Sequence, residues 1–446
     1  MKKIHFIAIG GKAMHNLALA LCQKGYQITG SDDEIYDPSL TRLKDAGLLP
    51  EEMGWDPARI TEDIDVIILG MHARSDNPEL ARALELGLKV YSYPEFLYEM
   101  SKEKTRVVVA GSHGKTTTTA LIMRSLEESG LNHDYMVGAQ IDGYERMVSI
   151  SDSDIIVLEG DEYLSSPIDR RPKFLHYHPH VVIITGIAWD HINVFPTFDS
   201  YVKQFSLLIA SVEQGGTVIY FKEDHHIQEL IASIDRDDLE LIPYASAKLN
   251  DGNEVFLNHQ WMKLPIIGKH NYQNLEACRL CVRKLGVDEA TFAKAMLSFK
   301  GVSRRLQVVP VESGNLVFID YAHAPSKVKA TTAAVREWYP DQSLVACFEL
   351  HTFSSLNESF LPEYRDAMSD ADNAIIYYDH HTIEMKRMKP LNSDRIRKAF
   401  NRSDALVITE KEELEDEVSA LQKKEVIFLF MSSGTFSGLE FDKIFK

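Results

Sequence analysis

The stretch VVVAGSHGKTTTT, residues 107–119, decides the fold of the central part of this chain. Apolar residues lead into glycines at 111 and 114, and Lys115 and Thr116 then open a run that is typical of a helix. A strand, a glycine turn and a helix in this order present backbone N–H groups to phosphate. The common loop G-x-x-x-x-G-K-[ST] would have its first glycine at position 109, where this chain has Val109. The stretch therefore predicts a shorter phosphate loop, in which Lys115 reaches the β- and γ-phosphates and Thr116 holds Mg²⁺.

Length and charge limit what the rest of the chain can be. The 446 residues are too many for one core, so two to three domains are expected. The formal net charge of -18 argues against nucleic acid and anionic membrane as partners. No run of 18 uninterrupted apolar residues occurs, so we expect a cytoplasmic protein without membrane insertion. Cys278 and Cys281 form a lone C-x-x-C in a helical stretch, which predicts a buried helix face rather than a zinc site.

Strands and helices alternate along the chain, which predicts an α/β fold of three domains. The first, residues 1–103, reads as a Rossmann-like unit in which Gly10 and Gly11 turn the chain and Asp32 ends the second strand. The second, 104–303, contains the phosphate loop, and the third, 304–446, reads as another Rossmann-like α/β domain. Strands are expected within 3–9, 26–32, 65–71, 89–96, 105–111, 153–163, 180–195, 343–353, 373–381 and 426–439.

Acidic and histidine side chains follow two of the central strands. Glu159 comes directly after the apolar run IIVL, with Asp161 and Glu162 close behind, and Asp190-His191 ends the next strand. Because open α/β sheets bind ligands at the carboxyl ends of their strands, these groups are expected beside the phosphate loop. Carboxylate oxygens suit Mg²⁺ next to phosphates, so Glu159 and His191 are predicted metal ligands.

Three further motifs hold candidate site residues. GKHNYQNLEAC (268–278) places Asn271 and Asn274 at a helix start, where they either cap the helix or bind an adenine edge. GVSRRLQ (301–307) places Arg305 at a domain joint, where an arginine can reach a phosphoryl group in transfer. DYAHAP places Asp320 and His323 just after a strand. The alternating HYHPH (176–180) is interpreted as the entry to a strand rather than as a metal site.

In this order, GxxGKT, strand-end Glu, strand-end Asp-His, G-x-H-N-x-x-N, R-R and D-Y-x-H-x-P resemble the Mur ligase family over nearly the whole chain. The resemblance implies a bacterial amide ligase of peptidoglycan biosynthesis or recycling that uses ATP and Mg²⁺. Its N-terminal domain would bind UDP-N-acetylmuramate, its central domain ATP, and its C-terminal domain the incoming amine. The substrate carboxylate would attack the γ-phosphate to give an acyl phosphate, which the amine then attacks. Domain closure would keep water away from that intermediate.

The resemblance also assigns individual residues. Lys115, Glu159, His191 and Arg305 would be catalytic, and Thr116, Glu159 and His191 would hold metal. The nucleotide would be bound by Gly111, Ser112, His113, Gly114, Lys115, Thr116, Thr117, Asn271, Asn274, Arg305 and Asp320. The sugar nucleotide and the amine would be bound by Gly10, Gly11, Met14, Ser31, Asp32, His72, Asn77, Arg170, Arg171 and His323.

Two amines are compatible with the sequence. AIGGKAMHNLALAL resembles the G-x-G-G-x-G-M pattern of members that add L-alanine, although Ala8 and Ala13 depart from it. GDEYLSSPIDRRPKFLHYHP and MSSGTFSGL instead resemble members that take the tripeptide L-Ala-γ-D-Glu-meso-diaminopimelate. That larger amine needs more cationic partners, which Arg170, Arg171 and Lys173 are expected to supply. The tripeptide is therefore the favoured amine and free L-alanine the alternative.

Three other classes of protein share parts of this pattern. Gly10-Gly11 and Asp32 alone fit an NAD-binding oxidoreductase, but that class leaves the phosphate loop and the third domain unexplained. A non-catalytic phosphate-loop module would not need Lys115, Glu159 and His191 together. A folylpolyglutamate-synthase-like ligase would share the central domain but lack a domain like residues 1–103.

Overall fold

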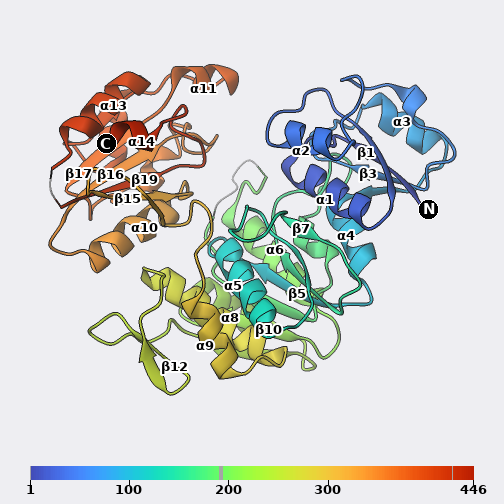
Figure 1. Ribbon diagram of the computed structural model, residues 1–446, viewed down its shortest axis with the longest axis horizontal. Helices are drawn as coiled ribbons and strands as arrows, with labels where there is room; N and C mark the ends of the chain where they lie inside the picture. Colours follow the sequence, from blue (N-terminus) through green and yellow to red (C-terminus); the bar gives the residue numbers. More distant parts are fainter. Residues whose placement is uncertain (1, 190–193, 424) are drawn as a thin grey trace. The chain divides into compact units, whose positions relative to one another are not determined.

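The computed structural model of this protein describes residues 2–189, 194–423 and 425–446. In these residues the strands form three larger sheets (Figure 1). Contacts divide the chain into two compact units, Met1–Met262 with Asn274–Phe299 and Lys263–Gln273 with Lys300–Lys446. The strands of each larger sheet fall within one predicted domain, so the α/β fold is confirmed. The boundaries at 103/104 and 303/304 stay predictions.

The N-terminal sheet is parallel, with strand order β2-β1-β3-β4. Alternate residues of one strand pack on opposite faces: Val66 and Ile68 join one apolar cluster, and Ile67 and Leu69 join another. Both faces are thus covered, as a parallel sheet requires. The elements are β1 (Lys3–Ile7), α1 (Lys12–Gln23), β2 (Gln27–Ser31), α2 (Ser39–Asp45), η1 (Pro57–Arg59), β3 (Val66–Leu69), α3 (Pro78–Glu85), β4 (Val90–Ser92) and α4 (Tyr93–Ser101).

The strand predicted over 89–96 is wrong in its second half, because α4 begins at Tyr93. Ser92 accepts a hydrogen bond from the Glu95 N–H, and the Glu95 carboxylate accepts one from the Ser92 N–H. This reciprocal capping box starts a helix, and Pro94 suits its first turn. The S-x-x-E spacing in the sequence was the signal for it.

The central sheet has the strand order β11-β10-β9-β5-β8-β6-β7 and is parallel except for β7. Its middle strand, β5, pairs with β8 and β9, and Val109 lies opposite both Glu159 and Ile183. The phosphate loop therefore leaves the sheet between β9 and β8, the strand that ends at Glu159. The elements are β5 (Thr105–Ala110), α5 (Lys115–Glu128), β6 (Asp134–Met136), β7 (Val148–Ser149), β8 (Ile155–Glu159), η2 (Lys173–His176), β9 (Val181–Ile184), α6 (Phe198–Ala210), β10 (Thr217–Phe221), α7 (His225–Ala232), β11 (Glu240–Tyr244), β12 (Val255–Leu257), β13 (Gln260–Met262), α8 (Lys269–Lys284) and α9 (Glu289–Leu297).

The C-terminal sheet has the strand order β14-β15-β19-β16-β17-β18, with only β14 antiparallel. The chain's last strand, β19, lies between β15 and β16, so the three strand ends with polar residues are neighbours. The elements are β14 (Gln307–Val309), β15 (Leu316–Asp320), α10 (Pro325–Trp338), β16 (Ser343–Glu349), η3 (Leu361–Tyr364), β17 (Asn373–Tyr377), α11 (His380–Met385), α12 (Ser393–Phe400), β18 (Leu406–Ile408), α13 (Lys411–Ala420), β19 (Val426–Met431) and α14 (Phe441–Ile444).

Two smaller predictions have definite outcomes. Cys278 and Cys281 are both fully buried on α8, so the buried helix face is confirmed. The HYHPH segment leads directly into β9, which starts at Val181, as predicted. The segment itself is not extended, because His176 ends η2 and His178 has a φ of 41°. Among the described residues, no helix combines the length and the apolar character needed to cross a bilayer.

Candidate functional site

The phosphate loop depends on glycine at both of its turns. Gly111 has a φ of 127° and Gly114 a φ of 72°, backbone conformations that favour glycine. A Cβ at Gly111 would lie 2.2 Å from Thr185 Oγ1, and one at Gly114 would lie 2.2 Å from Asn274 Oδ1. Thr185, directly after β9, and Asn274, on α8, therefore lie close to the two glycines of the loop. Within it Ser112 is buried, Thr117 is largely buried and His113 is half-buried.

Lys115 stands at the first position of α5 and is held from two sides. Its ammonium donates to Glu162 Oε2 at 2.7 Å and to the Gly111 carbonyl oxygen at 2.7 Å. Burial alone would lower the pKa of Lys115, but the carboxylates of Glu162, Asp161 and Glu159 outweigh it and raise that pKa above its ordinary value. The lysine thus carries a fixed positive charge at the mouth of the loop, as polyphosphate binding requires.

Thr116 and Glu159 form the predicted metal-binding pair. The Thr116 hydroxyl donates to Glu159 Oε1 at 2.9 Å, and the Gly138 N–H donates to Glu159 Oε2 at 2.7 Å. Hydroxyl and carboxylate oxygens beside a phosphate loop are the hard donors that Mg²⁺ prefers, so these residues fit the ion. The third predicted ligand, His191, lies outside the described residues, as does Asp190.

In the N-terminal domain, Asp32 closes over the first glycine turn. Its Oδ2 accepts the Gly10 N–H at 2.6 Å, and a Cβ at Gly10 would lie 2.9 Å from the same oxygen. Burial raises the pKa of Asp32 to about 6, although the Gly10 N–H opposes this. Directly after Gly11, Lys12 begins α1, and its ammonium donates to the Gly138 carbonyl oxygen at 3.4 Å. Lys12 thus contacts the residue whose N–H donates to Glu159.

The other predicted sugar-nucleotide residues differ in their exposure. Ser31 is fully buried and donates its hydroxyl to Glu79. Asn77 caps α3 by accepting the Glu79 N–H at 2.9 Å. In this structure both residues therefore support the fold, and their predicted substrate role stays a prediction. Gly11 precedes α1, Met14 is buried on it, and His72 is exposed in the loop after β3.

The two asparagines of α8 face different surroundings. Asn271, the third residue of α8, donates its side-chain amide to the Ile267 carbonyl oxygen at 2.8 Å, which is not an N-cap bond. Asn274 is buried with its amide against Gly114. Asn274 thus contacts the phosphate loop, and the predicted contact of both asparagines with adenine stays a prediction.

Arg305 and Asp320 lie at the start of the C-terminal domain. Asp320 accepts the Leu306 N–H and the Ala322 N–H, each at 2.7 Å. Burial raises the pKa of Asp320, with the Arg305 charge acting against that rise. The Arg305 guanidinium lies 4.9 Å from the centre of the Tyr321 ring. Asp320 therefore fixes the segment that carries Arg305.

The carboxyl edge of the C-terminal sheet gathers acids and the segment MSSGTFSGL. Glu349, at the end of β16, is buried and accepts the Phe436 N–H at 2.9 Å and the Ser432 hydroxyl. Asp379 follows β17 and accepts the Ser437 hydroxyl at 3.0 Å. His323, half-buried after β15, has its Nδ1 at 2.8 Å from the Tyr321 carbonyl oxygen. The Arg304 guanidinium donates to the Ser432 carbonyl oxygen at 2.9 Å, so acids and a cation lie together at this edge.

The cations that were expected to serve a tripeptide are already paired. Arg171 forms an ion pair with Asp169 at 2.6 Å, and Lys173 forms one with Asp161 at 2.6 Å. Acids close to them in the chain thus pair with both side chains, and their predicted role toward a peptide substrate stays a prediction. Arg170 is exposed, and no ion pair is found for it among the described residues.

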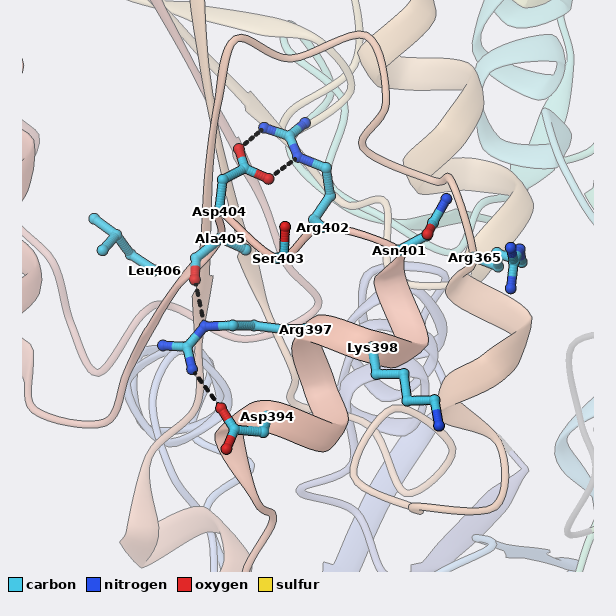
Figure 2. Close-up of a pocket in the computed structure, with 10 residues that line it drawn as sticks. All are labelled: Arg365, Asp394, Arg397, Lys398, Asn401, Arg402, Ser403, Asp404, Ala405 and Leu406. Carbon is cyan, nitrogen blue, oxygen red and sulfur yellow. Dashed lines mark hydrogen bonds and ion pairs between the residues drawn. The ribbon is translucent and has the colours of Figure 1, made fainter.

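A hollow of about 820 Å³ lies elsewhere, beside α12 in the C-terminal domain. Figure 2 shows its arginines turned to neighbouring groups: Arg402 to Asp404, and Arg397 to Asp394 and the Ala405 carbonyl oxygen. Because these guanidinium groups already have partners, and none of the predicted site residues lines the hollow, it is not a candidate active site.

Sequence reasoning missed two residues that shape the phosphate loop and its carboxylates. Gly138 positions Glu159, and Tyr201 donates to Glu162 Oε1 at 3.0 Å. Gly138 and Tyr201 lie in segments without a strand-end or loop motif, so nothing local pointed to them. Glu162 was seen only as part of an acidic cluster, since its burial depends on contacts distant in sequence.

The phosphate loop lies at the carboxyl edge of the central sheet, and its Lys115 faces carboxylates that include the buried Glu162. This arrangement defines a nucleotide-binding α/β protein. Comparison with known families identifies which one. The Mur ligase middle domain matches residues 109–282. The catalytic domain of the Mur ligase family matches residues 3–105, and the Mur ligase glutamate ligase domain matches residues 304–434.

Individual proteins that are similar to this chain carry names of the same family. The UDP-N-acetylmuramate–L-alanine ligase of Lacticaseibacillus paracasei is 32% identical over 83% of this chain and 83% of its own length. The UDP-N-acetylmuramate–L-alanyl-γ-D-glutamyl-meso-2,6-diaminoheptandioate ligase of Haemophilus influenzae is 29% identical over 76% of this chain and 77% of its own length. The crystal structure of UDP-N-acetylmuramate-alanine ligase from Thermotoga maritima shares the fold, with a TM-score of 0.70 at 22% identity over 98% of this chain and 97% of that one. The chain belongs to the Mur ligase family and is an ATP-dependent amide ligase.

Proposed function

We propose that this protein joins the lactyl carboxylate of UDP-N-acetylmuramate to the amine of an L-alanyl peptide, with L-Ala-γ-D-Glu-meso-diaminopimelate as the favoured amine. ATP is consumed and ADP and phosphate are released. The observation that carries the proposal is the contact of Lys115, Thr116, Glu159 and Glu162 around one phosphate loop. Because its substrates are ATP and a sugar nucleotide, we place the reaction in the bacterial cytoplasm.

Charge is the main obstacle to the first step, since a carboxylate must attack a triphosphate. Lys115 neutralises the β- and γ-phosphates, and the loop N–H groups bind them. Thr116 and Glu159 would hold Mg²⁺, which supplies further neutralisation when bound. The carboxylate oxygen then attacks the γ-phosphorus and the bond to ADP breaks, which gives an acyl phosphate.

The amine completes the reaction in the second step. Its nitrogen attacks the acyl carbon, phosphate leaves with the oxygen that had bridged carbon and phosphorus, and the amine loses a proton. The acidic edge formed by Glu349 and Asp379 supports an amine-binding role for the C-terminal domain. We propose that Arg305 and Asp320 act on the nucleotide from that domain.

Free L-alanine is the second candidate for the amine. The L. paracasei relative, named as an L-alanine ligase, favours it. The H. influenzae relative, named as a tripeptide ligase, favours the peptide. The pairing of Arg171 and Lys173 removes one argument for the peptide, so the preference rests on the block DEYLSSPIDRRPKF and on the ending MSSGTFSGL.

Phosphate release with ATP, Mg²⁺ and UDP-N-acetylmuramate, with each amine in turn, tests the proposal. We expect release with the tripeptide and little with L-alanine. Release with L-alanine alone would assign the second candidate. Release with neither amine would contradict the substrate assignment. A Lys115→Met variant serves as the control, because it keeps the helix but lacks the ammonium and is expected to be inactive.

A further inference from the structure

Glu162 lies at the centre of a buried hydrogen-bond network around the phosphate loop. Its Oε2 accepts from Lys115 at 2.7 Å and its Oε1 accepts the Tyr201 hydroxyl at 3.0 Å. The Tyr201 hydroxyl lies 2.7 Å from Ser112 Oγ, which also accepts the Ala188 N–H at 2.8 Å. Glu162 and Tyr201 are fully buried. The network therefore joins the phosphate loop, the segments after β8 and β9, and α6.

The hydrogen bonds in this network have one direction. Each hydroxyl has a single proton. Because the Tyr201 proton goes to Glu162, Ser112 must donate its own proton to Tyr201 Oη. Both oxygens of Glu162 accept, so Glu162 acts as a carboxylate. A neutral amide at this position would keep one acceptor and lose the charge that faces Lys115.

We propose that Glu162 is a positioning residue for the ligase reaction: it orients the Lys115 ammonium toward the phosphates and is itself held by Tyr201 and Ser112. The proposal rests on the proposed use of ATP. It differs from a role in substrate affinity, since the negative charge of Glu162 repels a triphosphate. Its contribution is to the direction of Lys115, and misplacing a catalytic group by about 1 Å costs on the order of 100-fold in rate.

Charge and geometry thus predict opposite effects of one substitution. Glu162→Gln removes a repulsive charge, so ATP and ADP should bind as tightly as to the wild type or more tightly. The same substitution loosens Lys115, so kcat should fall about 10- to 100-fold. AMP lacks the phosphates that Lys115 reaches, so its binding should not change.

Two further variants make the test specific. Tyr201→Phe removes the hydroxyl but keeps the ring, which packs edge-on against Phe195 and Phe205 at 5.5 Å and 5.4 Å. It should lower kcat severalfold with unchanged ATP affinity. The control is Glu128→Gln at the C-terminal end of α5. It breaks ion pairs with Arg124 of α5 and Lys294 of α9 and should change neither quantity.

The experiment measures ATP, ADP and AMP binding by calorimetry, kcat by phosphate release, and the thermal midpoint for each variant. Lower kcat in Glu162→Gln with undiminished ATP affinity supports the proposal. Unchanged kcat, or weaker binding of ATP and AMP alike, overturns it in favour of a structural role. If the wild type binds ATP but joins neither amine, the proposed substrates are wrong, and the binding data alone test the inference. Weaker ATP binding by Glu162→Gln then overturns the inference. ATP binding that is equal or tighter, with unchanged AMP binding, supports it.

Discussion

Gly114 is subject to two constraints that can be separated by mutation. Its φ of 72° disfavours any side chain, and a Cβ there would meet Asn274 Oδ1 at 2.2 Å. Gly130, after α5, has a similar φ of 74° but nothing within 4 Å of its Cβ position. We expect Gly130→Ala to cost about 1 kcal/mol in stability from backbone strain alone. Gly114→Ala should cost more and should also abolish ATP binding, as measured by thermal unfolding and calorimetry. Equal behaviour of the two variants would contradict the contact between the loop and α8.

Asp32 should make stability depend on pH. Burial raises its pKa from 3.8 to about 6, so between these values the folded state binds more protons than the unfolded state. Stability conferred by protonated Asp32 is therefore present below about pH 4 and is lost as the pH rises toward 6, by up to about 3 kcal/mol. Asp32→Asn keeps an acceptor for the Gly10 N–H and should flatten this part of the profile, as measured by urea unfolding at several pH values. Parallel profiles for the two proteins would show that the folded-state pKa of Asp32 is ordinary.

Single residues show where sequence reasoning succeeds and where it stops. Lys115, Thr116 and Glu159 could be predicted to lie together because strand-end positions and loop motifs determine their place in a parallel sheet. The hydrogen bond of Ser31 to Glu79 and the ion pair of Arg171 with Asp169 were not predicted. Such pairings depend on side-chain contacts that no motif records.

At the scale of elements, Arg106 on β5 joins several segments. It is almost fully buried, and its guanidinium donates to the carbonyl oxygens of Tyr177, His178, Ser101 and Lys102 at 2.6–3.0 Å. It thereby connects the end of α4 and the turn before β9 to the strand that carries the phosphate loop. This role could not be predicted, because the carbonyl oxygens that Arg106 contacts come mostly from segments distant in sequence.

Replacement of Arg106 by Met should lower the free energy of unfolding by about 3 kcal/mol or more, since several buried carbonyl oxygens would lose their donors. Arg171→Met is the matched control: Arg171 is 60% exposed in its ion pair with Asp169 and should contribute about 0–1 kcal/mol. Urea unfolding measures both. A loss below 1 kcal/mol for Arg106→Met would mean that water or other groups replace its hydrogen bonds.

Element boundaries were predicted less well than element types. The strand at 89–96 ends at Ser92 because the capping box with Glu95 starts α4. The strand at 180–195 ends at Ile184, where Thr185 and Gly186 hydrogen-bond to Ala110 and Ser112 at the phosphate loop. In both places a local hydrogen-bonding residue outweighs the apolar pattern that continues past it.

At the scale of the whole molecule, the order of motifs was enough to predict three α/β domains and the family. Each domain contributes a mostly parallel sheet, and polar residues follow its strand ends. The amine substrate could not be derived in this way, because acids on the C-terminal sheet edge suit any amine. The central claim for the whole molecule is that the carboxylate of the sugar nucleotide, rather than water, attacks ATP.

The most direct test uses UDP-N-acetylmuramate labelled with ¹⁸O in both oxygens of its lactyl carboxylate, together with ATP, Mg²⁺ and the tripeptide. The phosphate released is analysed by mass spectrometry. An acyl phosphate transfers one carboxylate oxygen to phosphorus, so each phosphate should carry one ¹⁸O atom. Unlabelled phosphate formed together with the amide product would show that no acyl phosphate forms and would contradict the account.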